Sequence, residues 1–379
     1  MAALFEPIQL RNLTLQNRVC VSPMSQYQSK DGFANDWHFA HLSRFALGKC
    51  GLVFCEATAV SPEARRTPGD LGLWNDAQIE KLKSINAFIH DQGSASGIQL
   101  AHAGRKASER RPWHGETPLN DEDVELRNEA PWQAKGPTHQ PYGDDWPNPV
   151  AMSQQDIQNV IDAFGLAAAR AHQANFDAIE VYAAHGFLLH QFYSPLCNTR
   201  TDEWGGDFEG RTKLCMRVAE SIRKHWPDEK PLFFRISATD WLEGGWSVQD
   251  SVALAHNLKS VGVDVIDCSS GGIGGPHPVP RFPIGPAFQA DLAATVKNEA
   301  DIATMSVGFI WQAEVANQII QQEKCDLVAL GRELLNNPNW ALHAAHELKV
   351  DESYSQWHEA FGWWLNKRER IMHKLGLKT

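Results

Sequence analysis

The sequence lacks three features that would each define a class of protein. Its seven cysteines are odd in number and contain no C-x-x-C pair, which argues against a disulfide framework, a metal site or an iron–sulfur cluster. No apolar run approaches the ~20 residues that span a bilayer, and the N-terminus, MAALFEPIQLRNLTL, has no apolar segment of signal length. We therefore expect a cytoplasmic protein that binds no metal and no membrane.

The charged residues are dispersed along the chain. Asp and Glu number 46 against 35 Lys and Arg, which gives a net charge of −11, and no long block carries a single sign. A dispersed negative charge argues against nucleic acid or an anionic membrane as the partner. We expect a small-molecule substrate instead.

Short apolar runs alternate with amphipathic segments along most of the chain, as in parallel strands joined by crossover helices. Strands are expected at residues 18–24, 51–57, 96–102, 177–183, 231–237, 264–270, 302–307 and 326–331. Helices are expected at 35–48, 76–92, 153–174, 208–226, 247–261, 286–299 and 311–322, with a last one after Gly331. Eight repeats favour an α/β fold of the (β/α)8 TIM-barrel type over an open sheet, since such barrels need about 250 residues plus insertions.

Three segments fall outside the repeat. Residues 5–17, FEPIQLRNLTLQN, alternate like a hairpin, which we expect to cap the barrel. Residues 103–150 are rich in Pro, Trp, Gly and charge, and we interpret them as a capping loop insertion after the third strand; a disordered insertion is the alternative. Residues 351–379 form a C-terminal arm. We find no linker, so residues 1–379 are expected to form a single domain.

In a TIM barrel, the functional residues lie where strands end and the following loops begin. Gly308 and Gly331 follow the last two strands and Arg332 opens a helix, which is the usual place for a phosphate group on this fold. Gln99 and Arg235 add an amide and a cation, which suit the pyrimidine edge and N1 of a flavin. The set predicts flavin mononucleotide (FMN), although a single Arg or Gln at a strand end is more often an ordinary buried polar residue.

Four motifs give the chain a resemblance to a known family. They are LFEPIQLRNLTLQNRVCVSPMSQY (4–27), IQLAHAGRKAS (98–108), AAHGFLLHQFYSPLCNTRTDEWGGDFEGR (183–211) and VALGRELLNNP (328–338). In them the sequence resembles the old yellow enzymes over nearly its whole length, and is most similar to their xenobiotic-reductase, thermophilic-like branch. The resemblance implies an FMN-dependent oxidoreductase that passes hydride from NADPH or NADH to activated alkenes, quinones or nitro compounds.

The resemblance also assigns residues to the site. Carried over by position, it implies flavin contacts at Pro23, Met24, Ser25, Ala57, Gln99, Arg235, Gly308, Gly331 and Arg332. It implies that Tyr182 and His185 bind the substrate oxyanion. The other residues that it places around the substrate are Tyr27, Phe187 and Trp364.

Three positions depart from the family pattern. Position 182, usually His or Asn, is Tyr; its phenol can still donate one hydrogen bond, so Tyr182 and His185 would form a two-donor site for the oxyanion. Phe187 stands where a Tyr usually protonates the substrate carbon, and it has no proton to give. The acid would then be Tyr27, Tyr182 or a water. Ser25 replaces the usual Cys of this branch, so that a hydroxyl would face the flavin.

Three other interpretations remain open. Tyr182 and Phe187 can be ordinary core aromatics in a standard ene-reductase. The Tyr-x-x-His pair also resembles flavin-dependent amine dehydrogenases, and the 14 Trp could supply an aromatic cage for a cation, but the iron–sulfur cysteine cluster of those relatives is not found in the sequence. The third is a flavin-binding barrel without catalysis, which would not need His185, Gln99 and Arg235 together.

The segment WHEAFGWWLNKRER (357–370) is dense in aromatic and cationic residues, which suit a protein interface. Together with the resemblance it predicts a homodimer or homotetramer in which Trp363 or Trp364 reaches a neighbour's active site. The alternative is that these rings seal the edge of their own barrel.

Overall fold

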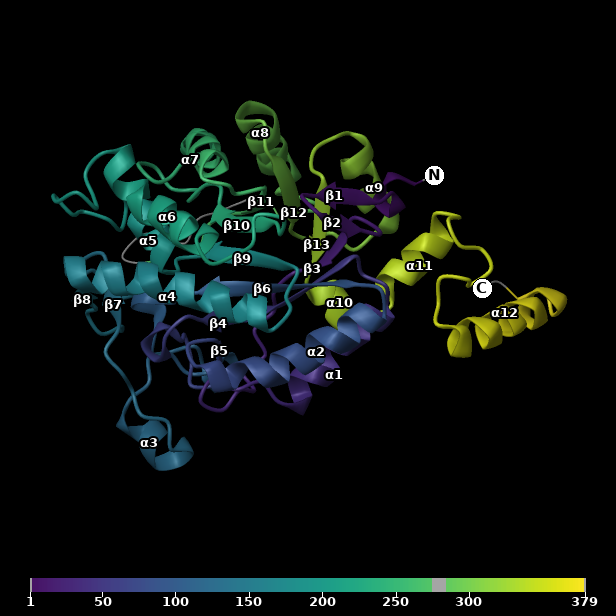
Figure 1. Cartoon of the computed structure of the whole chain (residues 1–379), viewed down its shortest axis with the longest axis horizontal. Coiled ribbons are helices and arrows are strands. Elements are labelled where there is room, and N and C mark those ends of the chain that lie inside the picture. Colours follow the sequence, from purple (N-terminus) through teal and green to yellow (C-terminus); the bar gives the residue numbers. More distant parts are fainter. Residues whose placement is uncertain (1, 275–283, 378–379) are drawn as a thin grey trace.

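The computed structural model describes residues 2–274 and 284–377; Met1, residues 275–283 and the last two residues of the expected C-terminal arm fall outside this description. Eight parallel strands form a ring in the order β3-β13-β12-β11-β10-β9-β6-β4, and β3 also pairs with β4, which closes it (Figure 1). These strands are β3 (Val19–Val21), β4 (Leu52–Ala59), β6 (Ala95–Ala101), β9 (Ala178–Ala183), β10 (Leu232–Ser237), β11 (Val265–Ser269), β12 (Ala303–Val307) and β13 (Leu327–Leu330). The expected (β/α)8 barrel is confirmed.

Helices follow the strands, and most of them cover the outside of the ring, whereas the last one projects away from it (Figure 1). They are α1 (Asp36–Leu47), α2 (Ile79–Asp91), α4 (Gln154–Gln173), α5 (Leu188–Tyr193), α6 (Phe208–Arg223), α7 (Val248–Ser260), α8 (Ala290–Ala300), α9 (Ala313–Gln321), α10 (Arg332–Asn336), α11 (Trp340–Glu347) and α12 (Glu359–Lys374). Asn35, Ser153 and Ser247 each accept a hydrogen bond from the first turn of α1, α4 and α7, which explains why these helices begin there.

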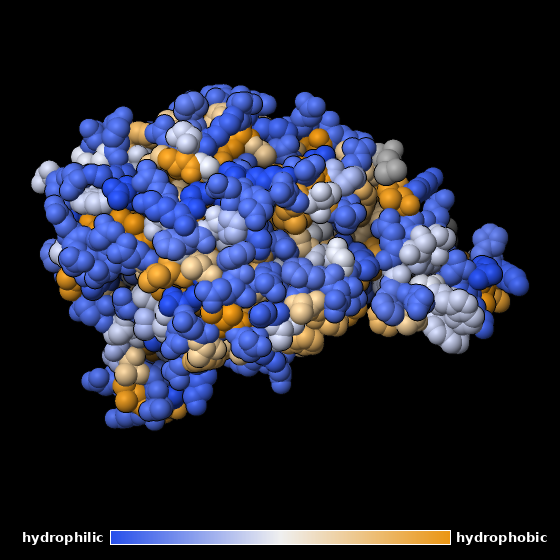
Figure 2. Space-filling model, in the orientation of Figure 1, coloured by the Kyte–Doolittle hydropathy of each residue, from blue (hydrophilic) through white to orange (hydrophobic). Residues whose placement is uncertain are grey.

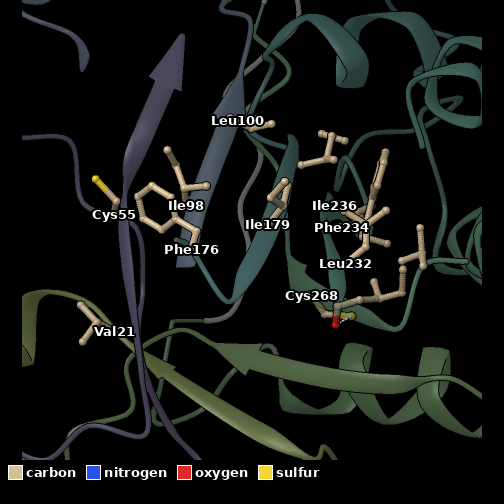
Figure 3. Packing of buried hydrophobic residues seen from close by; sticks show 14 of the residues in the cluster. Val21, Cys55, Ile98, Leu100, Phe176, Ile179, Leu232, Phe234, Ile236 and Cys268 are labelled. Carbon is tan, nitrogen blue, oxygen red and sulfur yellow. Dashed lines mark hydrogen bonds between the residues drawn. The ribbon is translucent and has the colours of Figure 1, made fainter. Parts of the chain in front are cut away.

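The outward-facing strand residues make the larger apolar layer. Ile98, Ile179 and Phe234 point away from the barrel axis and are buried (Figure 3). They belong to one cluster with helix residues such as Phe164 and Leu214. Because each such side chain contributes about 1.5–3 kcal/mol when it is fully buried, this layer holds the helices against the sheet.

The hairpin closes the amino end of the barrel as expected. Strands β1 (Ile8–Leu10) and β2 (Leu13–Leu15) pair antiparallel, and Leu10 and Leu15 pack with barrel-interior residues that include Phe233. Arg11 lies at the turn with φ of 51°, and its Nε forms an ion pair of 2.6 Å with Asp264. This contact ties the hairpin to the start of β11.

The insertion at 103–150 has secondary structure of its own. It contains the 3-10 helices Gly104–Lys106 and Pro112–His114, helix α3 (Asp121–Arg127) and the paired strands β7 (Lys135–Gly136) and β8 (Val150–Ala151). Its first turn lies against the carboxyl end of the barrel, where Arg105 Nη2 donates to Ile273 O at 2.8 Å, whereas α3 projects away (Figure 1). That the insertion caps a bound substrate stays a prediction.

Some expected boundaries were wrong, and two of them have a clear physical cause. The first strand ends at Val21 rather than at residue 24, because Pro23 has no N–H for the sheet. The helix expected at 286–299 begins only at Ala290. Ala287 adopts φ of 52°, and the Gln289 side chain donates to Val307 O, so the chain turns once more before the helix begins.

Hydrophilic residues cover most of the face shown in Figure 2, with apolar residues scattered among them. Within residues 2–274 and 284–377, none of the helices combines the length and the hydrophobicity that crossing a membrane requires. All seven cysteines are buried and free, which agrees with the expectation of no disulfide framework.

Candidate active site

A cavity of about 480 Å³ opens at the carboxyl ends of three neighbouring strands. It is lined by Ser22 and Met24 after β3, by residues 307–311 at the end of β12, and by residues 329–333 with Leu335 at the end of β13. Gly308 has φ of 118°, and a Cβ there would lie 2.6 Å from Gln289 Nε2, so the position requires glycine. Gly331 precedes α10, and the Arg332 guanidinium lies 5.1 Å from the Phe309 ring centre. The three residues predicted to bind phosphate therefore line one cavity.

The two residues predicted to bind the flavin ring are buried in the barrel beside two acids. Gln99 Nε2 donates to Glu180 Oε1 at 2.7 Å, and Arg235 Nε lies 3.2 Å from Asp267 Oδ2. Arg235 Nη1 also donates to Ser22 Oγ at 3.1 Å, which joins this group to the cavity. Burial, and then the charge of Asp267, raises the pKa of Glu180 well above its usual value, which favours the protonated acid.

Tyr182 and His185 are hydrogen-bonded to each other. Tyr182 Oη lies 2.9 Å from His185 Nδ1, and His185 Nε2 lies 2.5 Å from Ser269 Oγ. Burial, with Arg235 and Lys106 nearby, holds the pKa of His185 well below its usual value, so the imidazole is neutral and carries one N–H. The tautomer of His185 therefore decides whether the Tyr182 proton is used inside this pair or is free for a ligand.

The backbone holds His185 in an unfavourable conformation. His185 has φ of 55°, in the left-handed region that non-glycine residues rarely adopt. Its N–H donates to Ser237 Oγ at 2.9 Å, and its carbonyl accepts from Lys106 Nζ at 3.1 Å. The N–H of the next residue, Gly186, donates to His190 Nδ1 at 2.8 Å. These hydrogen bonds offset the strain and fix the direction of the imidazole.

Phe187 lies beside the pair. Its ring stands 4.1 Å from the Tyr182 ring, centre to centre, and it belongs to the same apolar cluster as Ala57 on β4, two strands away from β9. Lys106 Nζ lies 5.7 Å from the Phe187 ring centre and 4.6 Å from that of Tyr142. An amine is thus held between two aromatic rings next to the predicted substrate site.

Tyr27 reaches the same region from the loop after β3. It too has a left-handed backbone, with φ of 55°, and its hydroxyl accepts from Arg66 Nη1 at 3.3 Å. Arg66 in turn forms a two-point ion pair of 2.5 Å with Glu109. Burial raises the pKa of Tyr27 to about 12, so its proton is tightly held.

The remaining predicted flavin contacts lie in two strands and a loop that face this region. Ala57, on β4, is the register partner of Gln99 on β6. Pro23 and Ser25 are half-buried on either side of Met24. These residues therefore line the carboxyl end of the barrel, and their contact with a flavin stays a prediction.

The predicted aromatic residues of the C-terminal arm do not join the site within one chain. Helix α12 projects away from the barrel (Figure 1), and Trp363 and Trp364 are 59% and 62% exposed. The alternative that these rings seal their own barrel is therefore wrong. Lys367 Nζ lies 5.2 and 5.3 Å from the two ring centres. A second copy of the chain covering them stays a prediction.

Four functional candidates were missed in the sequence. Glu180 and Asp267 interrupt the apolar strands AIEVYA and VIDCS, and an acid inside such a strand was a usable signal. Lys106 and Glu109 lie in the insertion, where charged residues are ordinary, so nothing in the sequence distinguished them.

Comparisons with known proteins agree with this geometry. Residues 3–351 match the family described as NADH:flavin oxidoreductase / NADH oxidase. An NADH:flavin oxidoreductase from Gibberella zeae is 41% identical over 365 residues, which cover 92% of this chain and 86% of that protein.

Two solved structures share the fold. Morphinone reductase superimposes with a TM-score of 0.74 at 23% identity, covering 91% of this chain and 89% of its own. A 2-naphthoyl-CoA reductase complex gives a TM-score of 0.81 at 22% identity over 91% of this chain, which spans only 52% of that protein.

Proposed function

The chain belongs to the NADH:flavin oxidoreductase / NADH oxidase family, the old yellow enzymes, and on that premise we propose that it binds FMN and passes hydride from NADPH or NADH to electron-poor acceptors. The acceptors are activated alkenes such as α,β-unsaturated carbonyls, quinones and nitro compounds. One observation carries the proposal: a glycine-lined cavity and a buried amide–cation edge lie together at the carboxyl end of the barrel.

The residues at this end fit FMN in size and in chemistry. A cavity of about 480 Å³ lies within the range of small-molecule sites. Gly308 and Gly331 would let the phosphate approach the backbone, and Arg332 would supply its counter-charge. Gln99 and Arg235 would contact the pyrimidine edge, where the cation suits a negative charge on the reduced ring. The other predicted contacts are Pro23, Met24, Ser25 and Ala57.

Bound FMN supplies hydride transfer, and the chain's own residues orient the acceptor. Tyr182 Oη lies within hydrogen-bond distance of His185 Nδ1, and Ser269 Oγ within hydrogen-bond distance of His185 Nε2. In the tautomer that we propose, the Ser269 hydroxyl donates to Nε2, and the Nδ1–H donates to the Tyr182 oxygen. This tautomer leaves the Tyr182 proton free to bind the oxygen of an enone as negative charge develops on it. A donor placed in this way typically contributes about 3–4 kcal/mol to the transition state. In this arrangement only Tyr182 donates to the substrate oxygen, and His185 donates to Tyr182. The sequence had instead predicted that both residues donate to the substrate directly.

Amine oxidation is less well supported. A methylated ammonium would need free aromatic faces, and Lys106 Nζ already lies against the faces of Tyr142 and Phe187. A binding barrel without catalysis would gain nothing from a strained His185 at the carboxyl end of the barrel. Neither function is favoured by an observation of its own.

Heat release and anaerobic reduction test the proposal. The purified protein should be yellow, and heat denaturation should release FMN in solution. Addition of NADPH or NADH without oxygen should bleach the flavin, and a quinone, a nitroarene or an enone should restore the colour. Release of FAD, or of no flavin, would overturn the proposed cofactor, and a flavin that stays yellow with both nucleotides would leave only the binding role.

A further inference from the structure

Reduction of a carbon–carbon double bond needs a proton for the second carbon, and the site offers few groups that can give one. Phe187 has none. Tyr27 is held by Arg66, and burial raises its pKa to about 12. In the proposed function, Tyr182 directs its proton to the substrate oxygen rather than to carbon, and burial raises its pKa as well. Neither phenol is therefore a ready acid at neutral pH.

Lys106 is a proton-bearing group that lies beside the Phe187 ring. It belongs to the 3-10 turn Gly104–Lys106 and is only 7% exposed. Its Nζ donates to His185 O at 3.1 Å and lies between the rings of Tyr142 and Phe187. Among the residues that the structure describes, it forms no ion pair; the nearby carboxylate of Glu109 is paired with Arg66 instead.

The geometry points to Lys106 as the acid that protonates the substrate carbon, an inference that rests on the proposed function. As hydride from the NAD(P)H-reduced flavin reaches one alkene carbon, an N–H bond of the Lys106 ammonium breaks and a C–H bond forms at the other carbon. The electron pair of the double bond forms that new bond. Lys106 is left as a neutral amine and regains a proton from water.

The charge state of Lys106 suits this role. Burial lowers its pKa to about 7, close to neutral pH. An acid is most effective when its pKa lies near the working pH. The charged or titratable groups around it are Arg66, Arg105, Glu109, Glu116, Tyr142 and His185. The two arginines lower its pKa further, and the two glutamates raise it.

Three variants separate an acid from a residue that only positions His185. Lys106→Arg keeps a charge and donors but cannot give up a proton at neutral pH. Lys106→Met removes the charge and the donors. The double variant Lys106→Met/Phe187→Tyr removes the amine and adds a phenol hydroxyl at position 187, whose ring lies beside the amine in the wild type. Lys49→Met is the matched control. Lys49, which precedes β4, is also partly buried, and its Nζ likewise donates to a backbone carbonyl, that of Gln92.

The half-reactions give the main readout. We expect Lys106→Arg and Lys106→Met to slow flavin reoxidation by 2-cyclohexenone by about 10²-fold. Flavin reduction by NADPH, and reoxidation by benzoquinone, should change less than about twofold, because quinone protons land on oxygen and come from water. The double variant should recover most of the enone rate, and Lys49→Met should match wild type.

Two further readouts do not depend on the size of the rate. The wild-type enone rate should fall as pH rises through about 7, where the ammonium is lost, and this step should be absent in Lys106→Arg. In protein labelled with 13C at lysine Cε, one resonance of the flavin-bound enzyme should titrate near pH 7 and be missing in Lys106→Arg.

Several outcomes would overturn the inference. They are an unchanged enone rate in Lys106→Arg, no recovery in the double variant, or no lysine that titrates near neutral pH. Absence of FMN, or a flavin that NAD(P)H does not reduce, would instead overturn the proposed function on which the inference rests.

Discussion

The two ends of the barrel are built from the same strands but filled with different chemistry. On β9, β10 and β11 the inward residues at the amino end are Ala178, Phe233 and Val265, which pack with the hairpin. Two residues further along each strand, on the same face, are Glu180, Arg235 and Asp267, all buried. A step of two residues along each strand therefore separates the apolar layer that packs on the hairpin from a layer of buried ionisable residues.

The difference shows what each end contributes. At the amino end, apolar side chains are buried against one another, which stabilises the fold. The carboxyl end buries ionisable groups, which lowers stability unless they are paired or neutral. The raised pKa of Glu180 favours its neutral form, and Arg235 is paired with Asp267. We therefore propose that the charged end carries the function and that the apolar end supplies stability that offsets the burial of charged groups.

The largest effect is expected at the amino end. Phe233→Ala removes a ring that packs 5.4 Å from the Phe54 ring, centre to centre, and should lower the free energy of unfolding by about 3–5 kcal/mol. Urea denaturation measures the loss. Flavin affinity of the folded variant should not change; a large loss of flavin affinity at unchanged stability would contradict the division between the two ends.

At the carboxyl end, Phe187→Tyr should change chemistry rather than stability. The new phenol would supply a second carbon acid, and enone-driven reoxidation should accelerate, by up to about 10²-fold where proton transfer limits the rate. Stopped-flow traces with an enone and with a quinone test this, because only the enone rate should respond. Equal acceleration of both would show that the substitution acts through the flavin instead.

The carboxyl end should also make the fold sensitive to acid. Burial lowers the pKa of His102 to about 4, below its usual value of 6.5, and its Nδ1 accepts from Gly104 N. As pH falls through the usual pKa toward about 4, the unfolded chain takes a proton that the folded chain refuses, so stability is lost. Between pH 7 and pH 5, the free energy of unfolding of His102→Asn should fall by about 2 kcal/mol less than that of the wild type. Urea denaturation at the two pH values measures these changes, and an equal loss of stability in wild type and variant would contradict the prediction.

Arg332→Ala tests the cavity with a smaller expected effect. One charge-assisted contact to a phosphate is worth about 1.5–3 kcal/mol, so the FMN dissociation constant should rise by at least about tenfold. Fluorescence of released FMN on dilution measures it. Arg368→Ala, on α12, is the matched control and should leave FMN retention unchanged.

The smallest effect is expected for Glu180→Gln. If Glu180 holds a proton, the amide replaces a neutral group of the same shape and can still accept from Gln99, so stability should change by less than about 1 kcal/mol. A loss of about 3 kcal/mol or more in urea unfolding would show an ionised Glu180 that is needed as a partner of Arg235.

The fold was predictable because periodicity is a local property. Each strand and each helix after it could be placed, and the hairpin was recognised from alternation over 5–17. The errors lie where a distant contact decides the local structure. The start of α8 is one example, since Gln289 bonds to Val307 on a neighbouring strand.

The sequence predicted which residues lie at the site, but not which of their side chains contact one another. Gln99, Arg235 and the cavity residues could be assigned from motifs, because strand ends of a barrel converge. The bond between Tyr182 and His185, and the amine of Lys106 beside Phe187, could not, because each depends on side-chain directions set by contacts between separate segments.

By itself, the sequence determined the barrel, the family and the kinds of side chain at its carboxyl end. Only the tertiary structure decided which of those side chains are charged, which are paired and which protons are free. The physical reason is that a pKa depends on burial and on neighbouring charges. For Lys106 and His185, both are supplied by strands and loops that are distant in the chain.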